Sequence, residues 1–112
     1  MEVSVKTEED ICVVSVLHSR IDAAVALEFK ETMRRSARDS SAHIVLDLGQ
    51  VDFIDSSGLG AIVATMKHLA PARSLILAGM TPTVDKVFKL TRMDSVFSIF
   101  PTLEEALDGQ RG

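Results

Sequence analysis

The stretch VDFIDSSGLG, residues 51–60, joins a short apolar segment to the most apolar helical pattern in the chain. Residues 43–48 precede it and have the apolar character of a buried strand. After it, an apolar stripe at helical spacing predicts a helix. The stripe consists of Leu59, Ile62, Val63, Met66 and Leu69. A polar turn of small residues therefore connects a buried strand to a buried helix.

Outward from this turn, strand and helix patterns alternate along the chain. The predicted strands are Val3 to Lys6, Ile11 to Leu17, His43 to Leu48, Ser74 to Ala78 and Ser95 to Phe100, and the predicted helices span residues 23–38, 59–69, 82–91 and 103–107. The order β-β-α-β-α-β-α-β-α predicts an α/β fold. We expect a mixed sheet of about five strands, parallel in its centre and packed by about four helices.

Helix boundaries are indicated by capping residues. Asp22 precedes the first helical pattern and is expected to cap it, while Arg38 belongs to a group of arginines in its last turn. Thr81 and Pro82 are typical of a helix start, and Thr102 has a glutamate three residues on, as in a capping box.

Length and composition bound the class of protein. With 112 residues, of which 46% are hydrophobic, we expect one domain over residues 1–108 and a flexible tail over 109–112. The single cysteine, Cys12, excludes a disulfide framework. The chain has neither a signal peptide pattern nor a membrane-spanning segment. These features predict a cytoplasmic protein without membrane insertion.

Charge and missing motifs argue against several functions. A net charge of -4 and the absence of Trp and Tyr disfavour direct binding of nucleic acid. Neither a Walker loop nor a nucleophile elbow is present. The histidines His18, His43 and His68 lie on separate elements without metal-site spacing. We therefore expect no enzyme activity, no metal and no cofactor.

Two interpretations of the turn at Asp55 and Ser56 follow from its residue types alone. Asp and Ser are favoured helix caps, so the turn could serve only to start a helix. Alternatively, a phosphate on a hydroxyl at this helix start would add about -1.5 to -2 charges and repel a partner that fits the neutral serine. A third interpretation, a phosphoacceptor aspartate like that of a receiver domain, lacks the paired acids and the lysine of that class.

Residues 45–48 and 51–60 together resemble the signature of the STAS domain, specifically that of the bacterial anti-sigma factor antagonists. The resemblance covers nearly the whole chain, including Ile21-Asp22 before the first helix and the segment from Thr81-Pro82 to Met93. It implies a STAS-like α/β fold. One departure concerns residues 18–21, where the family commonly has a glycine-containing turn and this chain has His18-Ser19-Arg20-Ile21.

The resemblance also implies partner switching and assigns its residues. Ser56 would be phosphorylated by an anti-sigma factor that is also an ATP-dependent serine kinase, which releases the antagonist, and a PP2C-type phosphatase would reverse this. The implied partner-binding residues are Asp22, Asp55, Ser56, Ser57 and Gly58, with Ser57 as a cap. The unphosphorylated form would bind the kinase and free the sigma factor.

Other outputs and assembly states stay open. The same fold could act on a response-regulator-linked pathway, in a stress-sensing complex or as a soluble subunit of a lipid transporter. Arg20 could select a partner or could simply be a solvated side chain. An unpaired edge strand is compatible with either a monomer or a weak dimer.

Overall fold

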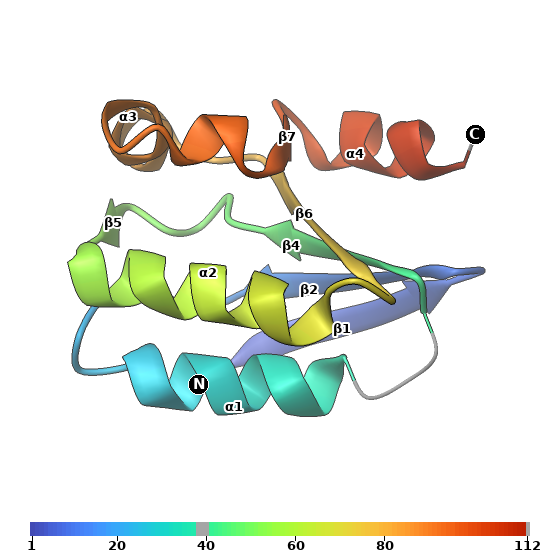
Figure 1. The fold of residues 1–112 in the computed structure, drawn as a ribbon, viewed down its shortest axis with the longest axis horizontal. Helices are drawn as coiled ribbons and strands as arrows, with labels where there is room; N and C mark the ends of the chain where they lie inside the picture. The colour runs from blue at the N-terminus through green and yellow to red at the C-terminus, as the bar shows by residue number, and fades with distance from the viewer. Residues whose placement is uncertain (38–40, 112) are drawn as a thin grey trace.

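The strands form a five-stranded mixed sheet in the structure, a computed structural model that describes residues 1–37 and 41–111. The spatial order is β1-β2-β4-β6-β7 (Figure 1). The strands are β1 (Val3–Glu8), β2 (Ile11–Val16), β4 (His43–Asp47), β6 (Ser74–Ala78) and β7 (Ser98–Phe100). β1 pairs antiparallel with β2, and all the other neighbours are parallel. The predicted mixed sheet with a parallel centre is confirmed.

Four α-helices pack on this sheet, as predicted. They are α1 (Ala26–Ser36), α2 (Ser56–Leu69), α3 (Pro82–Leu90) and α4 (Leu103–Gln110). α1 and α2 contact each other along their lengths, and Figure 1 shows them on the opposite side of the sheet from α4. The two faces of the sheet are therefore covered by different parts of the chain.

Successive side chains of β2 point into two different hydrophobic cores, which explains why this strand is apolar almost throughout. Cys12 and Val14 belong to the larger hydrophobic core, which lies on the α1 and α2 side. Ile11 and Val13 belong to a smaller core that includes Ala106 of α4. A strand covered on both faces lacks the polar alternation of a half-exposed strand.

A second, two-stranded parallel sheet was not predicted. It consists of β3 (Arg20–Ile21) and β5 (Phe53–Ile54), with Arg20 opposite Phe53. Two residues are too few to produce a periodic pattern in the sequence. This small sheet brings the segment before α1 alongside the segment that leads into α2.

The predicted start of α1 and the role of Asp22 as its cap were wrong. The helix begins at Ala26, and its N-cap residue, Val25, makes no side-chain cap. Asp22 Oδ1 instead accepts a hydrogen bond from the N–H of Ala24, which closes a turn before the helix. The prediction for Arg38 lies outside the described residues.

Other boundaries also differ from the predictions. β1 extends to Glu8, so the hairpin turn is shorter than expected. β7 begins at Ser98, because Met93–Ser95 form a 3-10 turn that follows Arg92 in the left-handed conformation, with φ 61°. α4 continues through Gln110 and so includes the first two residues of the predicted tail. Gly112 lies outside the described residues, and flexibility of the tail stays a prediction.

Of the three predicted helix starts, the one at Thr102 is confirmed, and the one at Thr81 and Pro82 is confirmed in part. Thr102 Oγ1 accepts a hydrogen bond from the N–H of Glu105 at 3.1 Å and so caps α4. Pro82 occupies the first turn of α3. Thr81 makes no side-chain cap and donates its hydroxyl to the carbonyl of Val51 at 2.8 Å. That bond ties the start of α3 to the segment before β5.

Candidate functional site

The candidate site is built around the first turn of α2, where Asp55 is the N-cap residue. Its backbone is extended, and its Oδ1 accepts a hydrogen bond from the N–H of Gly58 at 2.8 Å. An N-cap carboxylate satisfies one of the N–H groups that a helix start leaves without an intrahelical partner. The cap determines where α2 begins and therefore where the serines that follow are placed.

The second carboxylate oxygen of Asp55 reaches across to the turn after β3. Oδ2 accepts a hydrogen bond from the N–H of Ala23 at 3.1 Å. One side chain thus joins two segments that are 32 residues apart in sequence. The start of α2 and the turn that contains Asp22 are held as one surface.

Gly58 lets these segments approach closely. A Cβ atom on Gly58 would lie 1.8 Å from the carbonyl oxygen of Ile21. The carbonyl belongs to the backbone of β3, so it cannot move aside as a flexible side chain could. Any other residue at position 58 would therefore push the start of α2 and β3 apart.

Ser56 and Ser57 are the first two residues of α2, and both are exposed. Asp55 occupies the N-cap position, so the prediction of Ser57 as a cap was wrong. Ser57 lies one residue inside the helix, past the position from which a side chain caps the first turn. The hydroxyl of Ser56 lies at the surface beside the capped turn, within reach of an external macromolecule.

Asp22 lies on the same surface and is tied to Arg20. The Arg20 Nε donates to Asp22 Oδ2 at 3.1 Å, while the guanidinium stacks over the ring of Phe53, 4.2 Å from its centroid. The carbonyl of Ser19 accepts hydrogen bonds from the N–H groups of Asp52 and Phe53. These bonds position the loop whose sequence departs from the family pattern.

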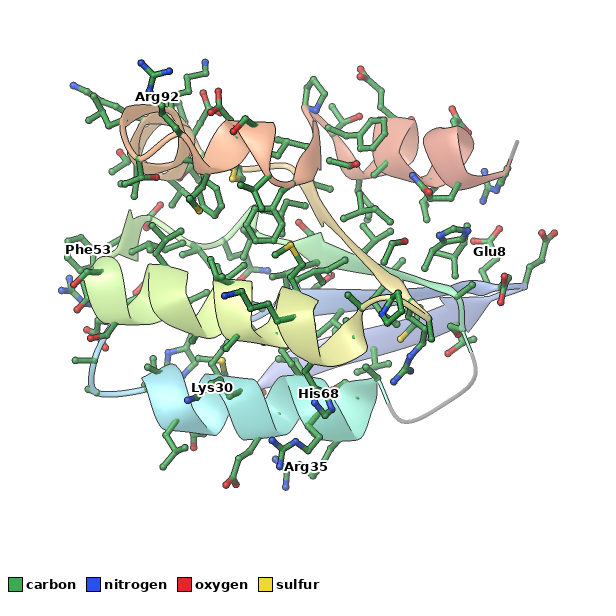
Figure 2. The ribbon with its side chains drawn as sticks, viewed as in Figure 1. Glu8, Lys30, Arg35, Phe53, His68 and Arg92 are labelled. Carbon is green, nitrogen blue, oxygen red and sulfur yellow. The ribbon has the colours of Figure 1, made fainter. Side chains whose placement is uncertain are left out.

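Phe53 was missed by the sequence reasoning. It is 37% exposed although it belongs to a strand, and Figure 2 shows it at the end of the molecule where α2 begins. A phenylalanine in an apolar segment is normally predicted to be buried. The only signal available was its place three residues before Ser56. The stacked pair of Arg20 and Phe53 adds a cation and an aromatic ring to the site.

The pKa of Asp55 is lowered from its ordinary value of 3.8. The largest cause is the hydrogen bond from Gly58, which favours the charged carboxylate; partial desolvation opposes it, and the N–H of Ala23 adds to the lowering. The carboxylate is therefore ionised at neutral pH. With Asp22 it gives the surface around Ser56 a negative character that Arg20 balances in part.

The described part of the chain has neither a grouped set of metal ligands nor a membrane-spanning helix. Within residues 1–37 and 41–111, no three His, Cys, Asp or Glu side chains are grouped so that they could hold a metal ion. Over the same residues, no helix combines the length and apolar character needed to cross a membrane.

Known proteins share both the fold and the sequence of this chain. Residues 2–106 match the profile of the STAS domain, and the chain belongs to the STAS domain family. The anti-sigma-F factor antagonist RsfB of Mycobacterium tuberculosis is 27% identical over 110 residues, which cover 98% of this chain and 89% of RsfB. The family resemblance stated from the sequence is confirmed.

Solved structures extend the comparison. An anti-sigma factor antagonist from Mycobacterium paratuberculosis superposes with a TM-score of 0.88 at 29% identity, covering 99% of this chain and 94% of that one. SpoIIAA, an anti-sigma factor antagonist, is known in an unphosphorylated form that superposes with a TM-score of 0.78 at 24% identity, covering 99% and 97%. At 24% identity, this comparison shows only that the two proteins share a fold.

The close contact at Gly58 yields a stability prediction. Gly58→Ala is expected to destabilise the fold by about 3 kcal/mol, because the added methyl group overlaps the backbone of Ile21. Gly60→Ala is the matched control, since its Cβ would meet no atom within 4 Å. It should stabilise α2 by about 0.5–1 kcal/mol. Urea unfolding of both variants measures the difference, and equal effects would contradict the close packing.

The lowered pKa of Asp55 predicts a pH-dependent contribution to stability. Because the pKa of Asp55 is lower in the folded state, the stabilisation is fully present at pH values above its unfolded-state pKa near 3.8. It is lost as the pH falls through the lower pKa of the folded state. Asp55→Asn should therefore lower the free energy of unfolding at pH 7, with a deficit that shrinks below about pH 4. Chemical unfolding at pH 2 to 7 measures this.

Asp52→Asn is the control for that experiment. Asp52 is exposed, and no side-chain hydrogen bond or ion pair of Asp52 is found over residues 1–37 and 41–111. Its variant should follow the wild-type pH profile. A deficit of Asp55→Asn that stays constant down to pH 2 would show that the carboxylate charge is not what stabilises the cap.

Proposed function

We propose that this chain is an anti-sigma factor antagonist whose activity is switched by phosphorylation of Ser56. Its unphosphorylated form binds a cognate anti-sigma factor that is also a serine kinase, and the sigma factor is released. Phosphorylation of Ser56 ends this binding, and a PP2C-type phosphatase restores it. The chain is the substrate in these reactions and catalyses none of them. Its place of action is the cytoplasm, where sigma factors meet RNA polymerase.

The observation that carries this proposal is the exposed Ser56 at the first position of α2, beside a capped and rigid turn. A protein kinase must bring the acceptor hydroxyl to the γ-phosphate of its ATP, so the acceptor must project from the surface. Ser56 meets this requirement. The names of the relatives, which are anti-sigma factor antagonists, support the same role.

The charges around Ser56 support a switch that acts by repulsion. Asp55 and Asp22 already place two carboxylates on the surface, and Arg20 is paired with Asp22. A phosphate would add about -1.5 to -2 charges next to them. A partner that fits a neutral hydroxyl here would have to desolvate a dianion, which is costly without a matching cation.

The rest of the proposed partner surface consists of Asp22, Asp55, Ser57 and Gly58. Three of them act by holding the backbone: Asp22 closes its turn, Asp55 joins that turn to α2, and Gly58 allows the close approach. Ser57 is exposed next to Ser56 and offers a second hydroxyl to a partner. A rigid surface loses little entropy on binding, which favours affinity.

The site of phosphorylation can be tested in the native cell. We expect the tagged wild-type chain and Ser57→Ala to carry phosphoserine at position 56, and Ser56→Ala to carry none. Mass spectrometry of the purified chain locates the phosphate and identifies the proteins bound to it. Equal phosphorylation of Ser56→Ala would contradict the assignment, and recovery of a transporter or a response regulator in place of a kinase would contradict the sigma-factor output.

The repulsion mechanism predicts different effects for charged and neutral replacements of Ser56. Ser56→Asp should weaken binding to the co-purified kinase by about tenfold or more, about 1.4 kcal/mol, because it places a charge where a hydroxyl fits. Asn has nearly the same size as Asp but no charge, so Ser56→Asn serves as the control. Calorimetric titration compares them, and an equal loss in both variants would assign the effect to size.

A further inference from the structure

A groove between α1 and α2 collects cations from both helices. Its volume is about 390 Å³, within the range of small-molecule sites, and four basic residues line it: Lys30 and Arg34 of α1, and Lys67 and His68 of α2. The remaining lining includes Ala64 of α2, which is exposed and presents a small apolar surface, whereas Met33 and Leu69 are buried. Figure 2 shows Lys30 and His68 at the seam between the two helices.

These cations have no acidic partners in the part of the chain that the structure describes. Over residues 1–37 and 41–111, none of Lys30, Arg34, Lys67 and His68 takes part in an ion pair. α2 contains no acidic residue; of the two acids of α1, Glu28 pairs with the amino terminus of the chain, and Glu31 takes part in no ion pair over the same residues. A chain with a net charge of -4 thus gathers unpaired positive charge in one groove.

Fold stability accounts for only part of the arrangement. Lys30 and Arg34 are four residues apart on α1, a spacing at which like charges destabilise a helix. Cations in the last turn of a helix complement its dipole, and this explains Arg34 and Lys67. Lys30 lies more than one turn before the end of α1 and gains nothing from that effect. An anion in the groove would relieve the repulsion.

We propose that the groove binds a small, soluble anion in which a phosphate group is joined to a small apolar group. The guanidinium of Arg34 can donate two parallel hydrogen bonds to phosphate oxygens, while Lys30 and Lys67 supply point charges. The apolar group would contact Ala64, the exposed apolar residue of the lining. His68 follows Ser56 by twelve residues, about 18 Å along α2, so this site is separate from the turn at Ser56.

The proposal predicts saturable binding of a simple probe, phenyl phosphate, to the wild-type chain. Titration followed by amide chemical shifts should map the changes to α1 and α2 around Lys30, Arg34, Lys67 and His68. Inorganic phosphate should bind more weakly because it has no apolar group to contact Ala64, and equal affinity would contradict the apolar part of the proposal. Absence of saturable binding at constant ionic strength would overturn the proposal.

Matched double variants separate a site from general charge. Arg34→Gln with Lys67→Gln should weaken phenyl phosphate binding by about tenfold or more. Lys86→Gln with Arg92→Gln removes the same charge from exposed residues in and after α3 and should leave binding unchanged. Figure 2 shows Arg92 far from Lys30 and His68. Equal weakening in the two variants would overturn the proposal.

Two further measurements complete the test. Thermal unfolding of both double variants should show cooperative transitions, so that lost binding is not lost folding, and phenyl phosphate should raise the wild-type midpoint. Vesicles of phosphatidylglycerol test whether the basic residues bind a lipid surface instead. Sedimentation with these vesicles in the absence of phenyl phosphate binding would overturn the proposal and assign the cations to a membrane surface.

Discussion

The carboxylate of Asp55 connects the two segments on which the candidate site depends. One oxygen caps α2 through Gly58, and the other holds Ala23 in the turn before α1. Without this carboxylate the two segments would still be joined by the short pairing of β3 with β5 and by the hydrogen bonds to the carbonyl of Ser19, but the cap and the link to Ala23 would be lost. The contact of Gly58 with the backbone of Ile21 leaves no room for displacement. The position of Ser56 is therefore set by backbone geometry.

This rigidity fits a switch that changes the charge of a surface and leaves the fold in place. Ser56 is exposed and its side chain is not required for the cap, since Asp55 performs that role. Esterification of the hydroxyl would thus remove no structural hydrogen bond of the first turn. The proposed control of partner binding would act through electrostatics and desolvation at the surface.

Most of the fold could be predicted because the strands of the main sheet and the helices packed on it carry long apolar patterns. The stripe that begins at Leu59 and the nearly continuous apolar run of β2 are examples. The small sheet that pairs Arg20 with Phe53 could not be predicted, since a strand of two residues is too short to produce a periodic pattern in the sequence. The role of Asp22 was missed because an aspartate before a helical pattern can close a turn as readily as cap the helix. The exposure of Phe53 depends on a tertiary contact with Arg20.

α2 carries different chemistry at its two ends. Its first turn presents hydroxyl groups and a capping carboxylate, whereas its last turn presents Lys67 and His68 with no acid anywhere between them. Because the helix packs against α1, β3, β5 and β6, its two ends are held in a constant relation. A ligand in the α1–α2 groove would leave the surface around Ser56 uncovered. A kinase and a small anion could thus bind the same domain at once, each at its own end of one helix.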